Sequence, residues 1–281
     1  MRYGMFMPNF GPFADAGLVR DLAAEAEACG WDGFFLWDHM LYTTQPPHPV
    51  ADPWIELAAA ACATTTIQLG PLLTPLARRR PWKVARETVT LDHLSHGRLI
   101  FGAGLGAPID ADFGRFGEEL SDRGRAIKLD EALEVLELLW SGREVSFRGE
   151  EYQIGPVTFL PTPVQRPRIP VWIGGKWPNR APFRRAARWD GLVPELAGGG
   201  LPTVADIADM TAFVREHRAS HGVGAARPFD VAVNGPDCWS REAELVKYAD
   251  AGVTWWLERI SPRRAFDVTE AAELIRRGPP A

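Results

Sequence analysis

The stretch Gly33-Phe34-Phe35-Leu36-Trp37-Asp38-His39 decides the fold prediction. Its apolar residues form an uninterrupted run, which is typical of a strand buried on both faces of a parallel sheet. The run then ends at an acid and an imidazole. In a barrel of alternating strands and helices, the functional site lies where the strand ends meet the following loops. We therefore expect Asp38 and His39 to lie in the mouth of a barrel, not in its core.

Seven further strand-like segments alternate with helical patterns along the chain. They are expected at residues 3–7, 67–73, 98–101, 171–173, 191–193, 230–233 and 253–257. Helix starts separate them, as at Asp52-Pro53, where Asp is a good N-cap and Pro suits the first turn. The tripeptide Trp-Asp-Gly recurs at 31–33 and 189–191, as matching positions in two halves of a barrel would. Eight strands alternating with helices predict an α/β fold, a (β/α)8 TIM barrel that forms a single domain over residues 1–281.

One segment departs from this alternation. Residues 145–147 and 152–154 alternate in polarity around Arg148-Gly149-Glu150, which predicts a hairpin inserted between strands four and five. A proline-rich stretch then returns the chain to the main pattern. Together with the loop from Leu41 to Val50, this hairpin is expected to form walls of the site, because loops are where such barrels diversify. Neither segment identifies a substrate beyond a small molecule.

Composition excludes several classes of partner. The 281 residues carry a formal net charge of −5, which gives no overall attraction to nucleic acid or anionic lipid. No apolar stretch is long enough to span a bilayer. Three widely spaced cysteines make neither a disulfide framework nor a metal site, so we expect no metal and a reducing cytoplasm. The arginine runs 78–80, 184–185 and 263–264 are interpreted as solvated surface.

Three groups of residues are candidates for chemistry. Asp38 and His39 pair a hydrogen-bonding acid with a group that exchanges protons near neutral pH. Gly102 to Ala107 satisfies a relaxed dinucleotide pattern, but no helix opens directly after it, so a glycine-lined loop under a flat ring is the preferred interpretation. Gly174-Gly175-Lys176, with a helix start at Asn179, suits a phosphate; a plain tight turn with a solvated lysine is the alternative.

These segments resemble the luciferase-like flavin-dependent oxidoreductases, the superfamily of bacterial luciferase and its deazaflavin-using relatives. The similar segments are Leu69 to Leu76, Arg80 to Glu87, Leu91 to Leu99, Gly102 to Gly106 and Val171 to Gly175. The resemblance implies a barrel that binds FMN or the deazaflavin coenzyme F420 at its carboxyl-terminal mouth, acts on a small molecule, and is often a homodimer. It covers most of residues 1–195.

The resemblance also implies individual roles. A non-proline cis peptide common in the family maps to Leu72-Leu73, with Thr74 near the edge of the ring system. Gly104 and Gly106 would lie beside the cofactor, while Gly174 and Gly175 would bind its phosphate. Lys176, which follows this glycine pair, is expected to add a positive charge there. An Asp-His pair like 38–39 is frequent in deazaflavin-using members, where the histidine lies close to the reactive ring centre.

The leading hypothesis is thus an oxidoreductase in which Asp38 fixes the ring edge and His39 moves the proton that accompanies hydride transfer. The Asp-His pair favours F420 over FMN, with which the enzyme would be a monooxygenase using O2. A non-catalytic flavin-binding protein and a nicotinamide-dependent dehydrogenase are further alternatives. Sugar-phosphate dehydrogenases of the deazaflavin branch carry a glutamate after the strand-four glycines. Here Ala107-Pro108-Ile109 follow, which argues against that substrate class.

Overall fold

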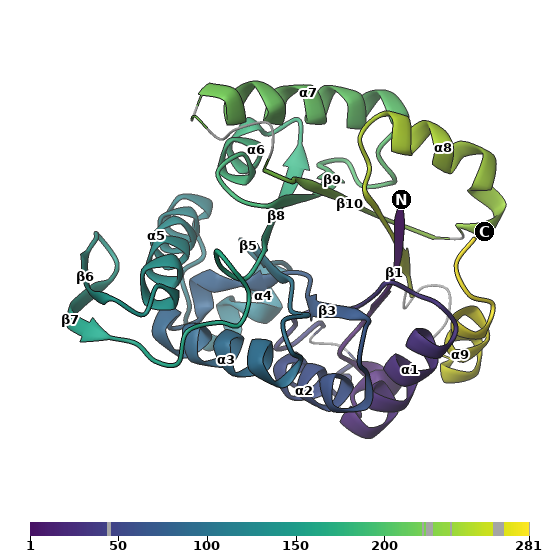
Figure 1. The fold of residues 1–281 in the computed structure, drawn as a ribbon, viewed down its shortest axis with the longest axis horizontal. Coiled ribbons are helices and arrows are strands. Elements are labelled where there is room, and N and C mark those ends of the chain that lie inside the picture. Colours follow the sequence, from purple (N-terminus) through teal and green to yellow (C-terminus); the bar gives the residue numbers. More distant parts are fainter. Residues whose placement is uncertain (44–45, 221, 223–226, 237, 261–266, 281) are drawn as a thin grey trace.

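The computed structural model describes residues 1–43, 46–220, 222, 227–236, 238–260 and 267–280. Within them, parallel strands form a barrel with helices around its outside (Figure 1). The barrel strands are β1 (Arg2–Met7), β2 (Gly33–Leu36), β3 (Gln68–Pro71), β4 (Thr74–Pro75), β5 (Phe101–Gly104), β8 (Val171–Trp177), β9 (Gly191–Leu196), β10 (Asp230–Gly235) and β11 (Trp255–Arg259). The α-helices are α1 (Ala16–Ala28), α2 (Pro53–Ala63), α3 (Pro81–Leu94), α4 (Ile109–Asp112), α5 (Asp122–Trp140), α6 (Arg180–Ala186), α7 (Val204–Ser220), α8 (Glu242–Asp250) and α9 (Val268–Arg276).

The predicted third strand is present as two pieces, β3 and β4. The strand order is β3-β2-β1-β11-β10-β9-β8-β5-β4, so β3 and β4 stand at the two ends of the pairing series. Because only Leu72 and Leu73 separate them in the chain, these two pieces together close the circle. The peptide between Leu72 and Leu73 is cis, as the resemblance implied. A bridge between Leu69 and Leu99 adds a contact at the same seam. The (β/α)8 prediction is confirmed.

Two boundaries differ from the sequence predictions. Strand four was expected at 98–101, but β5 starts at Phe101, because the buried Arg98 side chain turns back to bind carbonyl groups at the end of α2. The last helix was expected to open at Ser261-Pro262, which lie outside the described residues; α9 begins at Val268 behind the N-cap Asp267.

The repeated Trp-Asp-Gly tripeptide has the same structural role in both halves. Asp32 accepts a hydrogen bond from the Tyr3 amide of β1 at 2.8 Å, and Asp190 accepts one from the Val171 amide of β8 at 2.9 Å. In each case the carboxylate joins the start of one strand to the start of its neighbour. The echo in the sequence therefore marks equivalent positions in the barrel.

A layer of large side chains fills the barrel interior beneath its mouth. Phe35 of β2, Trp172 of β8 and Trp255 of β11 are fully buried there, with ring centroids 5.6–5.7 Å apart. Trp256, the next residue of β11, belongs instead to the outer core between strands and helices, as strand alternation predicts. Because this plug closes the interior from below, any ligand has to enter from the mouth.

Strands β6 (Glu144–Arg148) and β7 (Gln153–Thr158) pair antiparallel beyond α5 (Figure 1). Glu131 of α5 holds their connecting turn, because its carboxylate accepts the amides of residues 150, 151 and 152. Asp92 of α3 accepts the amides of Val164 and Gln165 in the proline-rich return. Carboxylates of the outer helices thus fasten this excursion to the barrel.

Glu56 of α2 is a buried acid that makes the stability of the protein depend on pH. It is fully buried, and neither carboxylate oxygen has a hydrogen-bond partner among the residues that the structure describes. Burial, followed by the charges of Asp52 and Asp15, raises its pKa from 4.5 to about 8. The folded protein therefore holds a proton that the unfolded chain releases above pH 4.5. Stability is complete below that pH and falls as pH rises toward 8.

Glu56→Gln is expected to remove this loss. The variant should match the wild type near pH ~4.5 and exceed its free energy of unfolding by about 3 kcal/mol near pH ~8.5. Urea unfolding followed by circular dichroism at both pH values measures the difference. Glu134→Gln, on a half-exposed acid paired with Arg188, is the matched control and should show no such pH dependence. A stability gain that is equal at both pH values would contradict the assignment.

Candidate functional site

A cavity of about 460 Å³ opens at the carboxyl ends of the barrel strands. Its volume lies in the range typical of small-ligand sites, roughly 300–1,000 Å³. The predicted site residues that line it are Asp38, His39, Leu73, Gly104, Gly106, Gly174, Gly175 and Lys176. Segments far apart in the sequence therefore share one cavity, as the placement at strand ends predicted.

Thr74 does not line this cavity. Its side chain is fully buried in β4, and its Oγ1 lacks a hydrogen-bond partner among the described residues. Its chain neighbours Leu72, Leu73 and Pro75 do line the cavity.

The floor of the cavity is made of glycine backbone covered by one leucine. A Cβ built on Gly174 would lie 2.0 Å from Leu73 Cδ1, and one on Gly104 would lie 3.2 Å from the same atom. Gly106 has a φ of +87°, and a Cβ there would lie 2.7 Å from both the Phe113 ring and Pro75. Larger residues at these positions would therefore displace Leu73 or the loop. Glycines keep this side of the cavity shallow and apolar.

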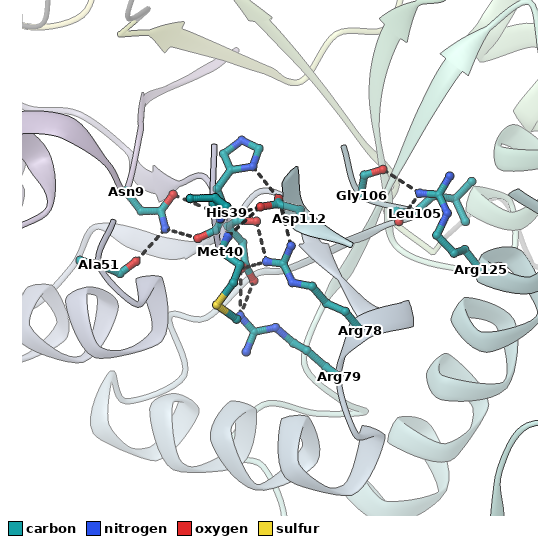
Figure 2. Close-up of polar contacts among 12 residues, drawn as sticks. Asn9, His39, Met40, Ala51, Arg78, Arg79, Leu105, Gly106, Asp112 and Arg125 are labelled. Atoms are coloured by element: carbon teal, nitrogen blue, oxygen red, sulfur yellow. Dashed lines mark hydrogen bonds and ion pairs between the residues drawn. The ribbon is translucent and has the colours of Figure 1, made fainter. Parts of the chain in front are cut away.

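Arg125 of α5 supports the glycine loop from behind. Its guanidinium donates to the carbonyls of Leu105 and Gly106 at 3.0 and 2.9 Å (Figure 2). It also lies over the Phe113 ring, 5.1 Å from the centroid, and is almost fully buried. No sequence pattern indicates this role, because Arg125 comes about twenty residues after the loop that it supports.

His39 lines the cavity in a fixed orientation. Asn9 donates to its carbonyl oxygen at 2.9 Å and accepts its amide at 3.2 Å, which fixes the backbone. Its Nδ1 lies 2.8 Å from Oδ2 of Asp112, and the ring is 14% exposed (Figure 2). Because a carboxylate only accepts hydrogen bonds, Nδ1 carries the proton in this pair. Nε2 is then left to act toward a ligand.

Asp112, at the end of the short helix α4, is the centre of this arrangement. Its Oδ1 accepts the amides of Met40 and Leu41, while its Oδ2 accepts from His39 and from Arg78 at 3.0 Å. Burial acts to raise the pKa of Asp112. The hydrogen bonds from His39 and Leu41 and the charges of His39 and Arg78 outweigh burial and lower it. Asp112 therefore stays ionised while it holds the imidazole.

The interpretation of Arg78 and Arg79 as solvated surface is wrong. Their side chains are 3% and 15% exposed, and both donate to the carboxylate of Asp38 at 2.7–3.0 Å (Figure 2). Arg78 links Asp38 to Asp112, so four charged side chains form one buried network behind His39. An isolated buried carboxylate would be very costly, and this need for partners explains why two arginines turn inward. Arg80, the third of the run, is exposed.

The network also changes the expected role of Asp38. Its side chain is 1% exposed, and both of its oxygens accept from arginines. A carboxylate engaged in this way orients Arg78 rather than the edge of a ligand.

Arg185 is another arginine that was assigned to the surface. It is nearly buried and paired with Asp130 at 2.5 Å. Arg263 and Arg264 lie outside the described residues.

Trp37 and Trp172 were both expected to border the ligand. Trp37 lines the cavity, and its ring lies 5.6 Å from that of Phe6 and 5.8 Å from that of His39. Trp172 instead belongs to the plug beneath the mouth. The two positions differ because only the last inward-facing residues of each strand reach the cavity.

Sequence comparison places the chain among redox enzymes and uncharacterized relatives. An uncharacterized protein of Mycobacterium tuberculosis is 29% identical over 299 residues, covering 98% of this chain and 97% of that protein. An F420-dependent glucose-6-phosphate dehydrogenase of Nakamurella multipartita is 32% identical over 174 residues, covering 60% of this chain and 48% of the dehydrogenase.

Solved structures share the fold at low identity. An F420-dependent secondary alcohol dehydrogenase in complex with an F420-acetone adduct superposes with a TM-score of 0.79 at 18% identity, covering 98% of this chain and 97% of the other. The F420-dependent tetrahydromethanopterin reductase of Methanopyrus kandleri gives 0.77 at 18%, covering 99% and 98%. The oxygenating constituent of 3,6-diketocamphane monooxygenase from Pseudomonas putida, in complex with FMN, gives 0.66 at 18%, covering 84% and 67%. The sequence profile of the luciferase-like monooxygenases matches residues 1–274, and the chain therefore belongs to that family.

Proposed function

We propose that this luciferase-like oxidoreductase holds coenzyme F420 in the cavity and uses it for hydride transfer to or from a small organic substrate. The observation that carries the proposal is the His39–Asp112 pair at the edge of a cavity whose floor is apolar and made of glycine. The F420-dependent dehydrogenase that is 32% identical supports the choice of cofactor. The whole chain acts as one domain in this proposal.

The residues of the cavity fit a planar ring with a phosphate-bearing tail. Leu73 over Gly104 and Gly174 offers a flat apolar surface, which suits one face of a tricyclic ring. Gly175, Lys176 and the N-cap Asn179 line the same cavity and suit a phosphate, because a lysine ammonium and backbone amides both favour an anion. When bound, such a ring supplies two-electron redox chemistry that amino-acid side chains lack.

His39 exchanges the proton that the redox step requires. With Asp112 fixing the proton on Nδ1, Nε2 of the neutral ring accepts a proton from a substrate hydroxyl, and in the reverse direction Nε2 of the imidazolium returns that proton to a carbonyl. Asp38, Arg78 and Arg79 act indirectly, because they hold Asp112 and the loop that carries His39. Asp38 is therefore a positioning residue in this scheme.

An FMN-dependent monooxygenase that uses O2 is the second candidate. The likeness to the camphane monooxygenase with bound FMN favours it, since a flat apolar floor suits the ring of either cofactor. The apo-protein should be titrated with oxidised F420 and with FMN, following ligand fluorescence. We expect F420 to bind at least about tenfold more tightly, a difference of roughly 1.4 kcal/mol. Tight FMN binding without F420 binding would replace the first proposal by the second, and binding of neither would refute both.

Expectations about assembly and location complete the proposal. The chain forms a homodimer in the cytoplasm, as the family resemblance and the spacing of its cysteines suggest, and it binds neither nucleic acid nor membrane. None of the helices that the structure describes has the length and apolar character to cross a bilayer.

A further inference from the structure

A row of polar side chains lines one arc of the cavity at the mouth of the barrel. Strands β8, β9, β10 and β11 stand side by side in the barrel. Their inward-facing residues below the mouth belong to the interior layer, namely Trp172, Val193, Ala232, Trp255 and Leu257. Because side chains alternate along a strand, the inward-facing positions above them are Glu195, Asn234 and Arg259, and on β8 they are Gly174 followed by Lys176. All five line the cavity, and four of them have polar side chains.

The opposite arc combines an apolar patch with Asp38 and His39. The patch is formed by Phe6, Trp37, Leu72 and Leu73, with glycine beside them. This apolar patch suits the flat ring of the proposed cofactor. The polar arc faces it across the cavity and is available for a second ligand.

The two cations of the polar arc have different neighbours. Lys176 is the register partner of Glu195 across β8 and β9, and it lies beside the glycine pair assigned to the cofactor phosphate. Arg259 is the register partner of Phe6 across β1 and β11. Since the ring of Phe6 contacts Trp37, and Trp37 contacts His39, Arg259 lies on the side of the cavity where the proton is exchanged.

Arg259 also has unused hydrogen-bonding capacity. Its Nε is buried without a hydrogen-bond partner, and its guanidinium forms no ion pair within the described part of the chain. Arg78, Arg79 and Arg125 also have an unpartnered Nε, but carboxylates or carbonyls accept hydrogen bonds from their Nη groups, whereas the side chain of Arg259 has no hydrogen bond among the described residues. A partly buried guanidinium that lines a cavity favours an anion, and its planar fork matches a carboxylate in two parallel hydrogen bonds.

We infer that Arg259, assisted by the amide of Asn234, binds a carboxylate group of the substrate and so orients its reacting carbon toward His39. The inference rests on the proposed function, because it assigns the second ligand of the same cavity. It narrows the substrate class from small organic molecules to small organic acids.

Matched aromatic probes test this inference without knowledge of the substrate. Benzoate and benzamide have the same size, but only benzoate carries a negative charge. Their binding to the cofactor-loaded protein is followed by quenching of tryptophan fluorescence, because Trp37 lines the cavity. Wild type is expected to bind benzoate at least about tenfold more tightly than benzamide, and Arg259→Gln should remove that preference. The cofactor affinity of Arg259→Gln should differ from that of wild type by less than about twofold. Loss of one direct interaction with the cofactor would instead lower the affinity about tenfold.

Control variants separate this inference from the proposed function. Lys176→Gln should weaken cofactor binding and keep the preference for benzoate, while Arg259→Lys should keep part of the preference. If wild type binds no cofactor, the proposed function fails, yet the two probes can still be compared on the apo-protein.

Three results would each refute the inference. They are equal affinities of wild type for benzoate and benzamide, no benzoate binding at millimolar concentration, and an unchanged preference for benzoate in Arg259→Gln. A parallel loss of cofactor affinity in Arg259→Gln would assign Arg259 to the cofactor instead. If Arg259→Gln fails to fold, the double variant Asn234→Leu/Arg259→Lys takes its place. This double variant must lower the preference for benzoate over benzamide, or the inference is wrong.

Discussion

Replacing Asp112 by asparagine is expected to lower turnover at least about a hundredfold while cofactor affinity stays nearly the same. The Asn oxygen is needed by the amides of Met40 and Leu41, which donate to Oδ1 at 3.0 and 2.7 Å. The amide nitrogen would then face His39 Nδ1 and donate to it. That reverses the tautomer and places the proton on Nε2, so His39 could no longer accept one from the substrate. Single-turnover kinetics over a range of pH measure the loss.

Asp110→Asn is the matched control for this prediction. Asp110 lies on the same short helix, but its side chain is 75% exposed and only weakly paired with Arg115, so turnover should stay within about twofold. His39→Ala should lose as much as Asp112→Asn, and the double variant should lose no more, because the two residues act as one unit. Turnover within threefold of wild type in folded Asp112→Asn, or fully additive losses, would show that the pair is structural.

Arg98→Met is expected to lower the free energy of unfolding by about 4 kcal/mol, since several buried acceptors would lose their donor at once. Arg98 is 7% exposed and has no carboxylate partner among the residues that the structure describes. Its guanidinium donates to the carbonyls of Ala61, Thr64, Ile67 and Ser95 and to the Thr64 hydroxyl, at 2.7–3.0 Å. Burial lowers its pKa, opposed by the charge of Glu27. The side chain joins the ends of α2 and α3 to the start of β3.

Urea unfolding of Arg98→Met, compared with wild type at neutral pH, measures this loss. Arg20→Met is the control, because Arg20 is 52% exposed and pairs only with its neighbour Asp21; it should change stability by less than about 0.5 kcal/mol. Arg98→Lys should fall between the two, since an ammonium cannot reach all of these acceptors. If Arg98→Met lowers the free energy of unfolding by less than about 1 kcal/mol, water replaces the guanidinium as donor to these carbonyls. Arg98 would then not be essential for stability.

Much of the barrel could be predicted because its signals are local. Apolar runs, N-caps such as Asp52 and Ser121, and turn residues report on neighbours in the chain, and the corresponding elements are present in the structure. The start of β5 was misplaced for the opposite reason. Arg98 looks like a residue of a strand entrance, but most of its partners lie more than thirty positions earlier in the chain.

The candidate site divides in the same way. Strand-end residues such as His39, Gly104 and Gly174 were found because a parallel barrel brings all strand ends to one mouth. Asp112 was missed because it lies on a four-residue helix in a polar stretch, 73 positions from its imidazole partner. Arg78 and Arg79 were assigned to the surface because a run of arginines looks the same in sequence whether it is solvated or paired.

By itself, the sequence determined the order of strands and helices and which residues stand at strand ends. Both follow from periodicity and from backbone preferences that act within a few residues. The partners of each buried charge were decided only by the tertiary structure, since an ionised group leaves water only where folding supplies an opposite charge or a full set of hydrogen bonds. Two arginines, Asp38 and Asp112 meet behind His39 for this reason, and that meeting gives His39 its orientation.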